Sequence, residues 1–132
     1  MSRSFSEPFL PLVAALDEAE PLPLAGRLPS YIADHRQRLR DRFLQAGGAA
    51  LPDYELLELV LFRAIPRQDV KPLARLLLDT FGDFNRVITA SPARLQMVKG
   101  AGPAVVLELK LVEAAAQRMM RARVMQKPVL SS

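Results

Sequence analysis

The stretch of sequence that decides the fold is LQMVKGAGPAVVLEL, residues 95–109. Gly100 and Gly102 stand one residue apart between two apolar runs, and Pro103 follows directly. Proline is well tolerated at the first position of a helix, where its missing N–H is not needed. Ser91 and Pro92 give the preceding segment a helix start of the same kind. The stretch therefore predicts a helix, a tight turn that holds both glycines, and a second helix.

Two nucleotide-binding motifs are excluded at this turn. A dinucleotide fingerprint needs a third glycine, but Val105 occupies that position, and the fingerprint follows a strand where this turn follows a helix. The chain also contains no Gly-Lys-Ser/Thr sequence, which a Walker loop requires. The remaining interpretations are a turn that meets the phosphate of a nucleic-acid strand and a turn that only packs against another helix or binds protein.

A turn of this composition can bind a phosphate through its backbone. Glycines can adopt positive φ angles and, without side chains, allow a phosphate to reach backbone N–H groups. The positive end of the following helix adds a second attraction for anions. Such a contact would hold a phosphodiester without reading bases. The candidate phosphate-binding residues are Lys99, Gly100, Ala101, Gly102 and Ala104.

The rest of the chain repeats helix signals and shows no convincing strand. Gly47 and Gly48 are expected to end a helix that begins near Tyr31, and the nearly all-apolar segment after Asp53 is predicted to be the buried centre. Asp53, Asp69 and Asp83 are expected to cap helices. We predict a compact all-α fold of about five to six helices, the last one running from residue 103 to about 124, with an inner stripe of Val105, Leu109, Val112, Ala116 and Met119.

Both ends of the chain differ from this helical part. Residues 1–29 hold five of the eleven prolines and are predicted to be a flexible leader, with at most a short helix at 12–19. Residues 30–125 are predicted to form the domain. Residues 126–132 read as the start of a linker.

Composition and charge limit the function. The net charge is +4; residues 1–30 hold two basic and four acidic side chains, so the remainder carries +6. A basic domain favours a polyanionic partner. With no cysteine and one histidine, thiolate or zinc chemistry is improbable, and we predict no catalytic, metal or cofactor residue. No apolar run is long enough to span a membrane, and the flanks of residues 9–16 do not fit a signal peptide, which favours the cytoplasm.

A second basic surface is predicted in HRQRLRDRF, residues 35–43. Arg36, Arg38 and Arg40 are expected to point away from an apolar face formed by Ile32 and its helical neighbours Leu39 and Phe43. They are candidates for phosphate contact. The alternative is a solvated face whose arginines pair with carboxylates, including those of the segment DYELLE at residues 53–58.

Two carboxylates and the histidine are candidates for catalysis by residue type alone. Glu55 and Glu58 lie one helical turn apart, but nothing near them in the sequence supplies a nucleophile or a metal. A salt bridge to an arginine or a helix-end interaction is the preferred interpretation. His35 is interpreted as a capping or packing residue.

The segment around the glycines resembles a helix-hairpin-helix element. Val98 to Gly102 match its pattern of hydrophobic-x-Gly-hydrophobic-Gly, with Ala101 smaller than usual between the glycines and Val106 larger than usual on the following helix. Over residues 35–132 the chain resembles the amino-terminal region of the RadC (UPF0758) family. The carrying pieces are HRQRLRDRFLQAGGAALPDYELLELVLFRAIPRQDVKPLARLLL, the hairpin, and KPVLSS.

The resemblance implies an association with DNA repair and a place in a longer protein. RadC-like proteins continue into a JAB1/MPN-type metalloprotease-like domain, whose metal-binding residues have no counterpart here. We therefore expect a sequence-independent DNA-binding module for duplex or branched DNA, not an enzyme. The alternative is a protein-interaction or regulatory module that docks on its own C-terminal domain or on a repair partner. The oligomeric state is left open.

Overall fold

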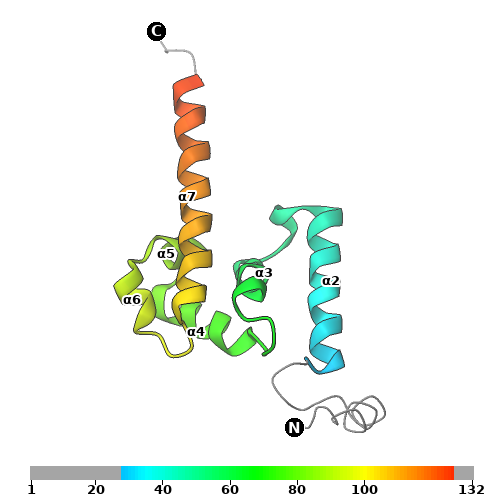
Figure 1. Cartoon of the computed structure of the whole chain (residues 1–132). Helices are drawn as coiled ribbons and strands as arrows, with labels where there is room; N and C mark the ends of the chain where they lie inside the picture. Colours follow the sequence, from blue (N-terminus) through cyan, green and yellow to red (C-terminus); the bar gives the residue numbers. More distant parts are fainter. Residues whose placement is uncertain (1–27, 127–132) are drawn as a thin grey trace, which may run out of the picture.

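The computed structural model of the protein describes residues 28–126, and every regular element in this range is helical (Figure 1). The predicted all-α fold is confirmed. The proposed leader helix at 12–19 and the tail from 127 lie outside the described residues. In chain order the elements are α2 (Ser30–Ala46), the 3₁₀ helix η1 (Gly48–Ala50), α3 (Asp53–Ala64), α4 (Lys71–Phe81), α5 (Phe84–Thr89), α6 (Pro92–Gln96) and α7 (Pro103–Gln126).

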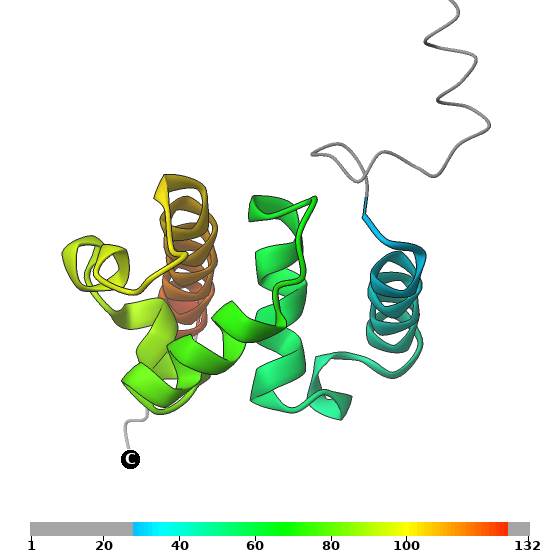
Figure 2. The same ribbon diagram turned by 90° about the horizontal axis from the view of Figure 1, so that it is seen from below.

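Helix α3 forms the centre of the domain, as its apolar sequence predicts. It packs against α2, α4, α5 and α7, and Figure 2 shows it between α2 and α7. Leu57 and Leu61 are completely buried, and Phe62 is almost so. Each such side chain contributes about 1.5–3 kcal/mol when it is removed from water. The helix is thus held from several sides.

Three of the expected helix signals are confirmed at the atomic level. Asp83 accepts a hydrogen bond from the backbone N–H of Arg86 at 2.8 Å, and Ser91 accepts one from that of Arg94 at 3.2 Å. Gly82 ends α4 with a φ of +110°, a conformation that favours glycine. These local interactions set the short, angled arrangement of α4, α5 and α6.

Asp53 does not cap its helix as expected. Pro52 occupies the N-cap position of α3, and Asp53 is the first residue of the helix. Its Oδ2 atom accepts a hydrogen bond from the backbone N–H of Phe84 at 3.1 Å, which links α3 to the start of α5. A contact across the fold has therefore replaced the local cap.

Arg36 is the main correction to the predicted basic surface. Its side chain is 3% exposed, and it lies on the inner face of α2 with Ile32 and Leu39. The spacing 32, 36, 39 follows one face of a helix, so an arginine occupies a core position. Phe43, expected to continue this face, is 38% exposed because it lies at the far end of α2, beside Gly48.

The guanidinium of Arg36 connects α2 to the end of α3 and the loop that follows. Nη2 donates to the carbonyl oxygens of Ile65 at 2.8 Å and Gln68 at 2.5 Å, and Nη1 donates to those of Phe62 and Pro66, both at 3.4 Å. Hydrogen bonds from a charged donor are roughly twice as strong as neutral ones. Arg36 therefore acts as a side-chain cap for the carbonyl groups at the C-terminus of α3.

A second polar contact joins the same two helices. His35 Nε2 and Glu58 Oε1 lie 3.1 Å apart, and the Glu58 side chain is completely buried. The sequence predicts an arginine partner or a helix-end role for Glu58, and its partner is instead the histidine. His35 therefore makes a polar contact with a buried carboxylate, whereas the sequence predicts a capping or packing role.

The distal half of α7 departs from the predicted inner stripe. Val105 and Leu109 are buried and Val112 is partly buried, but Met119 is 55% exposed. Figure 1 shows the reason: the second half of this 24-residue helix extends beyond the other helices. No described element packs beside Met119, so the stripe loses its partner there.

Replacement of Arg36 should destabilise the domain far more than replacement of a neighbouring surface arginine. We expect Arg36→Met to lower the free energy of unfolding by about 3 kcal/mol, because the carbonyl groups at the end of α3 lose their donor. Urea unfolding followed by circular dichroism measures this. Arg38→Met is the matched control on the exposed face of α2, and equal midpoints for the two variants would contradict the role of Arg36.

Candidate nucleic-acid interface

The helix-hairpin-helix element consists of α6, the turn at residues 97–102, and α7. Val98 and Ala101 are buried and anchor the turn in the core, with 8% and 6% of their surface exposed. The N–H of Ala101 donates to the Val98 carbonyl at 3.0 Å. Ala101 therefore packs well despite its size, but its amide is already used and does not fit the expected phosphate contact.

The two glycines of the turn have different roles. Gly100 has a φ of +94°, which an L-residue with a side chain rarely adopts, so the backbone requires glycine there. Gly102 does not have a positive φ, contrary to the expectation, and a Cβ atom placed on it would meet no atom within 4 Å. Neither backbone strain nor packing explains a glycine at 102. The open space above it is where an external group can approach.

Backbone donors without partners lie at Gly102 and close to it in the chain. Within the described part of the chain, the N–H groups of Gly102 and Ala104 have no acceptor. Ala104 lies in the first turn of α7, where N–H groups lack partners within the helix and the helix dipole is positive. The turn therefore has two amides without partners close to the positive end of α7, an arrangement suited to a phosphate.

Two cations flank the turn. Lys99 is exposed beside Gly100, and Arg94 on α6 lies with its guanidinium 5.0 Å from the centre of the Phe81 ring. Neither forms an ion pair with any residue in the range 28–126. Both charges are therefore available to an anion at the hairpin.

Comparison with known proteins identifies the domain. The family model described as UPF0758 N-terminal matches residues 33–107, more than half of the chain. This chain belongs to the UPF0758 family. The match spans α2 through the first turn of α7 and includes the hairpin, so the resemblance to the RadC (UPF0758) family is confirmed.

Two relatives show how much of such a protein this chain represents. It is 73% identical over 105 residues to a UPF0758 protein of Ruegeria pomeroyi, and 70% identical over 94 residues to one of Rhodobacter capsulatus. These alignments cover 80% and 71% of this chain but 47% and 44% of the relatives. The chain thus spans less than half the length of these curated relatives. No solved structure matches it.

The arginines of α2 in this UPF0758 domain lie apart from the hairpin. Figures 1 and 2 both place α2 and α6 at opposite edges, with α3 and α4 between them. Arg38 and Arg40 are exposed, and the Arg40 guanidinium lies 5.3 Å from the centre of the Phe62 ring. With Arg36 buried, the basic surface predicted on α2 is reduced to these two cations.

Arg42 is paired, as the alternative interpretation of this helix predicts. Its two guanidinium nitrogens donate to the Glu55 carboxylate at 2.7 and 3.1 Å. This hydrogen bond holds the pKa of Glu55 below its ordinary value of 4.5. Among residues 28–126, no group of three or more histidine, aspartate or glutamate side chains is placed to hold a metal ion, and no helix is long and apolar enough to cross a membrane.

Lys110 supports the hairpin, although it is not among the site residues predicted from the sequence. Its Nζ donates to the carbonyl oxygens of Ile88 at 2.9 Å and Ala90 at 2.5 Å, and to Glu113 Oε1 at 2.8 Å. Ala90 directly precedes Ser91, the N-cap of α6, so Lys110 ties the base of the hairpin to α7. These hydrogen bonds form only when α7 packs against the end of α5, so the sequence alone does not reveal them.

Alanine substitutions should separate the two glycines by their effect on stability. We expect Gly100→Ala to destabilise the domain by about 1–2 kcal/mol, because alanine is strained at the positive φ. Gly102→Ala should stay within about 0.5 kcal/mol of the wild type, as for other unconstrained surface positions. Thermal unfolding measures both, and a large loss for Gly102→Ala would show that its glycine serves the fold.

The ion pair between Arg42 and Glu55 predicts a small loss of stability in acid. A lowered pKa in the folded state means that the stabilisation is present above the ordinary pKa and disappears as the pH falls through the folded value. Because Arg42 is about half exposed, solvent screens the pair and the effect should be small. Glu55→Gln should therefore reduce the difference between unfolding midpoints at neutral and acidic pH. Asp79→Asn, which removes an exposed carboxylate, should not.

Proposed function

We propose that this domain binds DNA without sequence preference by holding a backbone phosphate at the hairpin. The carrying observation is Gly102, whose missing side chain serves neither conformation nor packing: its Cβ position is open, and among the described residues its own amide and that of Ala104 have no acceptor. A phosphate in this space would accept hydrogen bonds from the N–H groups of Gly102 and Ala104. Contacts of this kind fix the position of a nucleic acid and carry no base information.

The charge of the domain supports the same proposal. Lys99 and Arg94 are the cations nearest the turn, and Arg38 and Arg40 provide a separate attraction on α2. Cations that neutralise phosphates release counterions, so binding weakens as salt rises. In this proposal the partner is duplex or branched DNA, the setting is DNA repair in the cytoplasm, and the domain has no catalytic role of its own.

The test is binding of a labelled duplex by fluorescence anisotropy at several salt concentrations. We expect Gly102→Gln to weaken binding about tenfold or more, because its side chain fills the space in front of the amides. Ala93→Gln, on the exposed face of α6, is the control for adding the same side chain.

Lys99→Gln should lower the slope of the logarithm of affinity against the logarithm of salt concentration by about 0.9, while Arg121→Gln on distal α7 should leave it unchanged. No binding at low salt, or wild-type binding by Gly102→Gln, would refute the proposal.

A second candidate function is protein interaction, and distal α7 favours it. Several of its large apolar side chains are more than half exposed: Leu111, Met119, Met120, Val124 and Met125. Exposed apolar patches of this kind mark interaction sites. We propose the remainder of the longer UPF0758 proteins as the partner, because this helix continues past the family match. Association of that remainder with this chain that persists at high salt, and is lost in Met120→Gln/Val124→Gln, would support it.

A further inference from the structure

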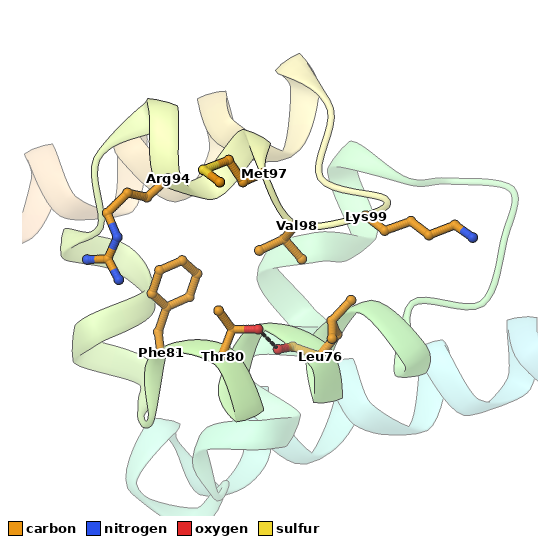
Figure 3. Close-up of a pocket in the computed structure, with 7 residues that line it drawn as sticks. All are labelled: Leu76, Thr80, Phe81, Arg94, Met97, Val98 and Lys99. Atoms are coloured by element: carbon orange, nitrogen blue, oxygen red, sulfur yellow. Dashed lines mark hydrogen bonds between the residues drawn. The ribbon is translucent and has the colours of Figure 1, made fainter.

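A groove of mixed apolar and basic character runs beside the hairpin. One hollow, with a volume of about 360 Å³, lies between α4 and α6 and is lined by Leu76, Phe81, Arg94 and Met97. Figure 3 shows these side chains facing one another across it, with Lys99 extending from its edge. A second hollow of about 370 Å³ adjoins it and shares Leu76 and Lys99. We call the two hollows together the hairpin groove.

The groove exposes apolar surface that nothing in the described chain covers. Met97 is 84% exposed and Leu76 is 40% exposed, although the buried side chains of Phe81 and Val98 line the same hollow. Arg94 and Lys99, which form no ion pair among residues 28–126, add two positive charges at its rim, and Asp69 adds one negative charge in the second hollow, so these three side chains leave the groove with a net positive charge. A fitting occupant is therefore an extended segment that combines large apolar side chains with carboxylates.

The chain itself contains such a segment. Residues 7–20 read EPFLPLVAALDEAE, an apolar run with one carboxylate before it and three within four residues after it. The four carboxylates give the segment a charge of −4, since it contains no lysine or arginine. This charge complements the basic rim of the groove, and the apolar run complements its lining.

Residues 7–20 are joined through residues 21–29 to the start of α2, which lies close to the groove. Arg36 on α2 bonds to the carbonyl oxygens of Ile65 and Gln68, and both of these residues line the second hollow. The start of α2 at Ser30 is six residues earlier, about 9 Å along the helix. In Figure 1 the start of α2, the α3–α4 loop and the α6–α7 turn all lie at the lower end of the molecule.

The length of the intervening chain is sufficient. Ser30 follows Glu20 by ten positions, and an extended chain of ten residues spans up to about 33–36 Å. A 100-residue domain has a radius of gyration of only about 13 Å. A segment attached this close has an effective concentration in the millimolar range, so even a weak site would be filled.

We propose that residues 7–20 dock in the hairpin groove of their own chain, with their apolar run against Leu76 and Met97 and their carboxylates near Lys99 and Arg94. Docked there, the segment would place negative charge where the proposed function places a DNA phosphate. It would compete with DNA for the hairpin; this consequence, unlike the docking, rests on the proposed function.

Cysteine cross-linking of the whole chain tests the docking directly, because the natural sequence contains no cysteine. The test variant is Val13→Cys/Thr80→Cys, with Val13 in the middle of the apolar run and Thr80 lining the groove. The control is Val13→Cys/Thr89→Cys, since both threonines are exposed and donate to the carbonyl four residues earlier. With a short bis-maleimide, we expect about fivefold more intramolecular product for the test pair, as local concentration dictates.

Changes in the leader complete this arm of the experiment. Phe9→Ser/Leu10→Ser, added to the test pair, should reduce the yield to that of the control. Equal yields for the two cysteine pairs would overturn the docking. Product found only as a cross-linked dimer would also overturn it, in favour of a second copy as the occupant.

DNA binding is measured separately on the chain without introduced cysteines. Asp17→Asn/Glu18→Gln/Glu20→Gln should tighten duplex binding by about tenfold, beyond any change in Asp34→Asn/Asp41→Asn/Asp79→Asn, which removes three carboxylates elsewhere. Preferential cross-linking without DNA binding by any variant would refute the proposed function and leave the docking supported. DNA binding together with equal cross-linking yields for the two cysteine pairs would refute the docking and leave the proposed function supported.

Discussion

The guanidinium of Arg36 meets the carbonyl groups that α3 leaves unpaired at its end, and the position of α2 depends on this contact. A helix terminus without partners is costly when it is buried, and here one charged side chain from another helix supplies several donors. The same contact brings the start of α2 next to the α3–α4 loop. The packing of α2 and the shape of that loop therefore both depend on one buried arginine.

In the hairpin, some residues anchor the turn in the fold, and other backbone amides have no hydrogen-bond partner among the described residues. Its tip is anchored by Val98 and Ala101 and its base by Lys110, so the turn is rigidly placed. Gly100 meets the conformational demand of the turn. This leaves the amides of Gly102 and Ala104 without internal partners among the described residues. A rigid support with a few unused donors is the arrangement that phosphate recognition needs, because binding then orders little of the protein.

Two surfaces of the domain are left without a partner in the described part of the chain, and they differ in chemistry. The hairpin groove combines apolar side chains with Arg94 and Lys99, which suits an acidic and apolar segment or, at its polar edge, a phosphate. Distal α7 is apolar on several sides and lies past the family match. The first surface favours interactions close to the hairpin, and the second favours contact with the portion of a longer UPF0758 protein that this chain does not include.

The sequence by itself was sufficient for the helical elements, because their signals are local. Ser91 and Asp83 accept hydrogen bonds from backbone N–H groups three residues away, and Gly100 supplies the positive φ that one turn requires. The all-α fold, the family and the hairpin followed from such patterns. The spacing of Arg36 from Ile32 and Leu39 is compatible with burial on the same helix face. A charged side chain is nevertheless not expected in the core unless it has hydrogen-bond acceptors there. Those acceptors belong to residues about 30 positions away in the chain, as does the partner of Asp53, and no periodicity reveals them.

The tertiary structure decided which charges are buried, which are paired and which remain free. It separated Gly100 from Gly102, which look equivalent in the sequence, because only folded neighbours show where a side chain would fit. It also exposed distal α7, since a helix can be longer than the domain that it joins. Local chemistry thus determined the elements, and long-range contacts determined which surfaces are left to bind.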